Sequence, residues 1–124
     1  MRTFAIEGSG DSPHVILDEA KKLLEISGNS TLKDTNWFYT NMLKWMIAFN
    51  SGDSRTETIN IRLQRINDSS AKWLTHIFRK LQYFAPDSAP EINWFANNRN
   101  NRRLIESARI LKEKTGYQVN LLVH

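Results

Sequence analysis

Residues 56–84 read TETINIRLQRINDSSAKWLTHIFRKLQYF and contain two hydrophobic periodicities, one after the other. In residues 56–66, apolar and polar side chains alternate, which is typical of a β-strand with one covered face. In residues 70–84, the apolar side chains recur at helical spacing, and charged side chains occupy the opposite face. A strand followed directly by an amphipathic helix predicts one unit of an α/β domain.

The segments on either side continue this alternation of strands and helices. Apolar runs at residues 15–18 and 23–26 predict an N-terminal β-hairpin. The later elements expected in order are a helix at 34–50, the strand at 56–66, the helix at 70–84, a strand at 92–96, a helix at 100–114 and a strand at 118–123. Since a helix precedes each later strand, right-handed crossovers and a mainly parallel sheet should result. The expected fold is α/β, with a mixed, mainly parallel five-stranded sheet, an N-terminal β-hairpin and three helices.

The helical stripes also predict the core. The side chains expected to face inward are Phe38, Met42, Met46 and Phe49 in the first helix, Leu74, Ile77, Phe78, Leu81 and Phe84 in the second, and Leu104, Ile105, Ala108 and Leu111 in the third. Gly116 is well placed to end the third helix in a left-handed turn. The tryptophans at positions 37, 45, 73 and 94 lie at or beside core-facing positions, so we expect them to pack inside the protein.

The composition is that of one ordinary globular domain, expected to span residues 1–124. Hydrophobic residues make up 40% of the chain and charged residues 24%. The absence of cysteine excludes disulfides, cysteine nucleophiles and Cys-ligated zinc, and it fits a reducing compartment. The N-terminal residues lack the apolar core of a signal peptide, and no apolar stretch is long enough to span a membrane. We therefore expect a cytoplasmic protein.

No pattern in the sequence predicts catalytic residues, a metal site or a cofactor site. The three histidines, His14, His76 and His124, have no metal-ligand partner three or four residues away. Nucleophile-elbow, P-loop and dinucleotide-binding motifs are missing, and the acidic residues are scattered. We therefore expect that the protein is not an enzyme.

The net charge of +4 is concentrated in one segment. Residues 97–114 contain six basic and two acidic residues, so this segment alone accounts for the whole excess. Three interpretations stay open. The segment could be a solvated helix face with pairs such as Arg109 and Glu113, a surface for an acidic protein, or a nucleic-acid site using Arg99, Arg102 and Arg103.

The junction between the strand at 56–66 and the following helix carries the polar tetrad Asn67-Asp68-Ser69-Ser70. The first backbone N–H groups of a helix have no partner within the helix, so a hydroxyl or a phosphate placed there can be stabilised by them. The simpler interpretation is that Asp68 or Ser69 only caps the helix, because both residue types suit that position. The sequence leaves both interpretations open.

Three stretches of the chain resemble the SiaC family of bacterial STAS-like phosphoproteins. They are FYTNMLKW at residues 38–45, the strand and helix start at residues 59–72, and the pair Asn93-Trp94. The resemblance extends to Ser12-Pro13, Asp18 and residues 28–30, and so covers nearly the whole chain. It implies a fold like that of anti-sigma factor antagonists and a non-enzymatic role in partner switching. A member of this family is phosphorylated by a cognate kinase, is dephosphorylated by a phosphatase, and in its unmodified form binds and activates a diguanylate cyclase.

One departure from the family lies at the junction. The family has Asn-Thr-Ser-Ser there, with the threonine as phosphoacceptor, whereas this chain has Asp68 in that position. A carboxylate carries about one negative charge, against about 1.5 to 2 for a phosphate, so Asp68 imitates the modified state only in part. The switch is locked, has moved to Ser69 or Ser70, or is lost. Ser69 is the favoured acceptor if one remains, because its hydroxyl is at the helix start.

A second departure follows Trp94, where the family tends to have a tyrosine and then an acidic run. Here Ala96 replaces the tyrosine, and residues 97–103 are rich in asparagine and arginine. Reversal of charge on an exposed segment changes which partners are repelled. We expect the binding surface to comprise Asn67 to Lys72 and the outer face of the following helix, with His76 and Arg79 nearest. The alternative is a nucleic-acid-binding domain using the basic helix after Arg99.

Overall fold

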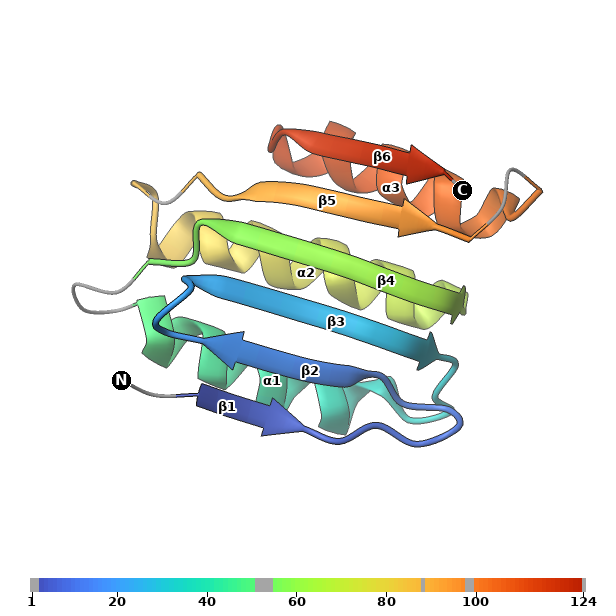
Figure 1. The fold of residues 1–124 in the computed structure, drawn as a ribbon, viewed down its shortest axis with the longest axis horizontal. Helices are drawn as coiled ribbons and strands as arrows, with labels where there is room; N and C mark the ends of the chain where they lie inside the picture. Colours follow the sequence, from blue (N-terminus) through green and yellow to red (C-terminus); the bar gives the residue numbers. More distant parts are fainter. Residues whose placement is uncertain (1–2, 51–54, 88, 98–99, 124) are drawn as a thin grey trace.

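The strands of the protein form one sheet in which their spatial order follows the chain (Figure 1). The computed structural model describes residues 3–50, 55–87, 89–97 and 100–123. Within them the elements are β1 (Thr3–Ile6), β2 (His14–Asp18), β3 (Leu23–Ser30), α1 (Thr35–Asn50), β4 (Thr58–Ile66), α2 (Asp68–Phe84), β5 (Glu91–Ala96), α3 (Arg102–Thr115) and β6 (Val119–Val123). The predicted α/β class, the three helices and the N-terminal hairpin of β2 and β3 are confirmed.

The sheet has six strands in the described residues, and the prediction of five was wrong by one. The additional strand, β1, pairs antiparallel with β2 at the edge of the sheet. With four residues, β1 is too short to show a clear alternation. Its position depends on distant contacts, because Phe4 stacks on Trp45 of α1 with ring centroids 5.9 Å apart.

The strands β3, β4, β5 and β6 are parallel, and a helix connects each to the next. When parallel strands follow one another in chain order and every crossover is right-handed, all connecting helices lie on the same face of the sheet. Figure 1 shows this arrangement, with α1, α2 and α3 together behind the sheet. The strand residues that face the helices, such as Ile26, Ile61 and Trp94, are buried.

The predicted core is mostly confirmed. The inward stripes of α1 and α2 are buried except for Phe84, and in α3 Leu104, Ala108 and Leu111 are buried while Ile105 is half-buried. Phe84, the last residue of α2, is 53% exposed, so the prediction that it faces inward was wrong. Gly116 adopts a φ of 72° and ends α3 as predicted.

Of the four tryptophans, Trp94 is buried, and Trp45 and Trp73 pack against the core. Trp37 is 72% exposed, so the prediction that it packs was wrong. Trp37 lies in the first turn of α1, next to the buried Phe38, and successive helical residues point about 100° apart. Adjacency to a core position in sequence therefore did not place it on the core face.

The carboxyl ends of β3 and β4 lie side by side, and this edge positions the junction found in the sequence. Gly28 has a φ of 93°, and the pairing of β3 with β4 shifts register between Gly28 and Asn29. After this irregularity the backbone N–H of Asn67 donates to the carbonyl oxygen of Ser30 at 2.9 Å. Both α1 and α2 begin just beyond this edge.

Candidate functional site

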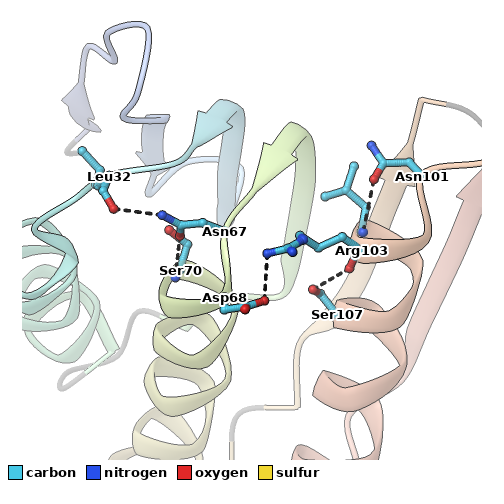
Figure 2. Close-up of polar contacts among 8 residues, drawn as sticks. Leu32, Asn67, Asp68, Ser70, Asn101, Arg103 and Ser107 are labelled. Carbon is cyan, nitrogen blue, oxygen red and sulfur yellow. Dashed lines mark hydrogen bonds and ion pairs between the residues drawn. The ribbon is translucent and has the colours of Figure 1, made fainter.

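The first turn of α2 is capped by Asn67. The Asn67 side chain has its Oδ1 2.9 Å from the backbone nitrogen of Ser70, which donates to it, and its Nδ2 donates to the carbonyl oxygen of Leu32 at 2.9 Å (Figure 2). Asn67 has the extended backbone of a cap residue, whereas Asp68 is already the first residue of the helix. The interpretation of Asp68 or Ser69 as the cap was therefore wrong, and both side chains are available for other contacts.

Asp68 points outward and reaches α3. Its side chain is 82% exposed, and its Oδ1 accepts a hydrogen bond from Nη1 of Arg103 at 2.8 Å (Figure 2). An exposed ion pair of this kind stabilises a fold by at most about 1 kcal/mol. Its main effect is to connect the N-terminal turns of α2 and α3 and to hold the guanidinium of Arg103 beside the junction.

Ser69 is exposed and faces the start of α1. The Oγ of Ser69 is 3.0 Å from the Oγ1 of Thr35, the first residue of α1, and either hydroxyl can donate. The N-terminal ends of α1 and α2 therefore meet at Ser69. Both ends carry partial positive charge, which favours a negatively charged group at this position.

Ser70 points inward. It is fully buried, and its Oγ accepts a hydrogen bond of 2.7 Å from the Oγ of Ser30, which also bonds to the hydroxyl of Tyr39. Burial raises the pKa of Tyr39, although the hydrogen bonds with Ser30 and Ser70 act in the opposite direction. These three hydroxyls anchor α2 to β3 and α1. The structure thus separates the predicted switch residues, with Asp68 and Ser69 facing outward and Ser70 facing the core.

The other residues predicted to bind a partner, Lys72, His76 and Arg79, lie together on the outer face of α2 and are exposed. They line a cavity of about 550 Å³ whose opposite side is formed by Ser107, Ile110 and Lys114 of α3. His76 also packs edge-on against Trp73, with centroids 5.3 Å apart. Sequence reasoning missed the contribution of α3, because the interval between the two helices in the chain gives no sign of which faces meet.

Carboxylates pair with two arginines of the predicted basic segment. Arg103 is paired with Asp68, and Arg109 contacts both Glu106 and Glu113. The hydrogen bonds and charges of Glu106 and Glu113 raise the pKa of Arg109, and Arg109 in turn lowers the pKa of Glu106. Arg102 is exposed, whereas Arg99 lies outside the described residues. These pairs are typical of a solvated helix face, and the other two interpretations of the segment stay predictions.

The described ranges contain no group of three or more histidine or acidic side chains that could hold a metal ion. His14 accepts a hydrogen bond at Nδ1 from the backbone nitrogen of Gly8 at 2.9 Å, and His124 lies outside the described residues. None of the helices seen in these ranges is long and apolar enough to cross a membrane.

Three solved structures have the same fold. SiaC of Pseudomonas aeruginosa aligns with a TM-score of 0.83 and 22% identity over 100% of both chains. A chain of the crystal structure of the diguanylate cyclase SiaD in complex with its activator SiaC, from the same organism, aligns with a TM-score of 0.82 and 22% identity over 98% of this chain and 99% of that one. The crystal structure of apo-SiaC from Pseudomonas aeruginosa aligns with a TM-score of 0.79 and 20% identity over 98% of this chain and 99% of that one.

A comparison with curated proteins gave no match. The family model for the SiaC family regulatory phosphoprotein matches residues 6–124. That match includes the sheet from β2 onward, all three helices and the junction at the start of α2. The chain therefore belongs to the SiaC family of regulatory phosphoproteins.

Proposed function

We propose that residues 1–124 form a single cytoplasmic regulatory domain without catalytic activity, which binds protein partners in a bacterial partner-switching pathway. Negative charge at the start of α2 controls this binding. The family of regulatory phosphoproteins to which the chain belongs supports the proposal. So does the structurally similar SiaC of Pseudomonas aeruginosa, an activator of the diguanylate cyclase SiaD that is found in complex with it. A diguanylate cyclase, a cognate kinase and a phosphatase are the proposed partners.

The observation that carries the proposal is the outward position of Asp68 and Ser69 beside a basic surface. Lys72 follows Ser69 by three residues and His76 follows it by seven, so on a helix they share a face with it. Arg103 is held beside the same turn by its contact with Asp68. A change of charge at Ser69 therefore acts directly on the surface that a partner would cover.

Ser69 is the proposed phosphoacceptor. Ser69 is an exposed residue, whereas the hydroxyl of Ser70 is buried in contact with Ser30 and is out of reach of a kinase. A phosphate on Ser69 would add about 1.5 to 2 negative charges and three acceptor oxygens to the fixed charge of Asp68. The added charge would attract Arg103 and Lys72 and would have to be desolvated by a docking partner, so affinity changes and no reaction is catalysed.

The test is a pull-down from native lysate that compares the wild-type chain with Asp68→Thr, Asp68→Ala, Ser69→Ala and Ser69→Glu. Gln118→Glu is the matched control, because this exposed residue precedes β6 and lies at the opposite edge of the sheet. The proposal expects the partner profile to change with the variants at positions 68 and 69 and to stay the same in the control. Identical profiles for all variants would rule out a switch at this junction.

A further inference from the structure

We propose that the groove between α2 and α3 binds one acidic, amphipathic helix of the partner protein. This inference rests on the proposed function, because it assigns the surface that the charge at the start of α2 controls. The two helices pack against each other on the same face of the sheet (Figure 1). The cavity of about 550 Å³ lies along them and is open to solvent.

The charge of the groove has one sign. Its lining includes four side chains that carry positive charge, Lys72, Arg79, Lys80 and Lys114. No aspartate or glutamate is part of that lining, and the ion pairs of the described residues involve none of these four cations. On the outer face of α3, by contrast, Arg109 is matched by two glutamates. The groove therefore brings four cations outside these ion pairs together in one hollow, where they attract an acidic partner.

The groove also offers apolar surface. Ala71, Tyr83 and Ile110 belong to its lining, and Tyr83 and Ile110 are among the large apolar side chains that remain exposed. Phe84 beside Tyr83 is exposed as well. A purely electrostatic contact would not need these side chains, whereas an amphipathic helix would bury its apolar stripe against them.

The length and direction of the groove favour a helix over other acidic partners. Crossover helices of consecutive parallel strands run in the same direction, and α2 has 17 residues, which corresponds to about 25 Å. A helix lying between α2 and α3 packs by the same ridges and grooves as any helix pair and completes a three-helix contact. Single-stranded nucleic acid is the competing occupant, because it too combines negative charge with stacking on exposed aromatic side chains.

The groove begins about one helical turn from the junction. Lys72 lies one turn below Ser69, and Ser107 lies one turn below Arg103, to whose carbonyl oxygen the Ser107 hydroxyl donates at 2.7 Å (Figure 2). A phosphate at Ser69 would therefore stand about one helical turn from Lys72, the groove cation nearest to the junction. It would repel an acidic helix and would offset the charge of Lys72, which gives the proposed switch a physical mechanism.

The test uses three fluorescein-labelled probes of defined chemistry with the full chain. The first is a peptide of about 18 residues, long enough for several helical turns, with a leucine stripe flanked by glutamates. The second replaces every glutamate with lysine, and the third is single-stranded DNA of similar charge. Fluorescence anisotropy should show binding of the acidic peptide with a Kd below about 1 mM, weakened by salt, and no binding of the lysine peptide.

The variants locate the site. Lys72→Glu with Lys80→Glu should weaken binding of the acidic peptide by about tenfold. The matched control, Lys21→Glu with Lys44→Glu, makes the same change in net charge at exposed positions outside the groove lining and should change binding by less than about twofold. Ile110→Ala should weaken binding without altering charge, and circular dichroism checks that each variant is folded.

Three results would overturn the inference: no binding of the acidic peptide, equal weakening by the groove and control pairs, or tighter binding of DNA than of the peptide at the same salt concentration. The outcome is separable from that of the switch. If partner profiles change with Asp68 but the acidic peptide does not bind, the groove assignment fails and the switch stands. If the peptide binds the groove and neither Ser69→Glu nor Asp68→Thr affects any partner, the switch fails and the groove stands.

Discussion

The inner and outer halves of the junction where β3 and β4 end differ in almost every physical respect, although three consecutive residues supply both. On the inner side, Ser70 is buried in a chain of hydroxyls with Ser30 and Tyr39. On the outer side, Asp68 and Ser69 contact Arg103 and Thr35 near solvent. The inner contacts should determine stability, and the outer ones should determine partner binding. Experiments that exchange these roles are the most direct way to test the division.

The largest effect on stability is expected when a charged side chain is placed in the inner half of the junction. Ser70→Asp buries a carboxylate among groups that already bond to one another, and an uncompensated buried charge costs about 3–5 kcal/mol. Ser69→Asp puts the same group at the exposed start of a helix, where negative charge is favourable, so its stability should change by less than about 1 kcal/mol. Denaturant unfolding of both variants measures the difference. Equal stabilities would show that Ser70 is not held in the core as described.

Removal of the buried hydroxyl of Tyr39 is expected to have the next largest effect on stability. Tyr39→Phe leaves the hydroxyl of Ser30 with one partner fewer and should cost about 1–2 kcal/mol at neutral pH. Tyr83→Phe is the control, since Tyr83 is 78% exposed. Its stability should match that of the wild type, and a comparable loss in both variants would contradict the difference in burial.

Tyr39 also predicts a pH dependence. Because burial raises its pKa, the folded protein keeps the proton to higher pH than the unfolded chain does. The resulting stability is fully present below about pH 10, where free tyrosine ionises, and is lost as pH rises further. Burial likewise raises the pKa of Tyr117 to about 12. The free energy of unfolding should therefore fall above about pH 10, and less steeply in Tyr39→Phe. An unchanged slope would mean that Tyr39 does not contribute.

Loss of the helix cap Asn67, which lies at the boundary of the two halves, should have an intermediate effect on stability. Asn67→Ala removes the acceptor for the Ser70 N–H and the donor to the Leu32 carbonyl, and loss of an N-cap costs about 1 kcal/mol. Asn67→Asp keeps the acceptor and loses only the donor, so thermal unfolding should place it between the wild type and Asn67→Ala. If Asn67→Asp is as unstable as Asn67→Ala, the bond to Leu32 and not the cap is the important contact.

The division between the two halves marks the limit of what the sequence could predict. The periodicity of residues 56–84 was sufficient to place a strand, a helix and a polar corner between them, because these features depend on neighbours in the chain. Which of Asp68, Ser69 and Ser70 faces inward depends instead on partners 34 to 40 residues away. Those partners come from β3, α1 and α3, and only the packing of the helices on one face of the sheet brings them together. The strand β1 was missed for the same reason, since its four residues are ordered by β2 and Trp45.

The smallest effect on stability is expected at the outermost contact, and there the effect on function should be greatest. The ion pair of Asp68 with Arg103 is exposed, so Asp68→Ala and Arg103→Ala should each change the free energy of unfolding by less than about 1 kcal/mol. A double-mutant cycle gives the coupling energy of the pair directly. Partner binding measured on the same variants should respond in opposite directions, because Asp68→Ala removes a negative charge beside the groove and Arg103→Ala removes a positive one. Binding that shifts in the same direction for both would indicate that the bridge orients the two helices, and that its charge does not control docking.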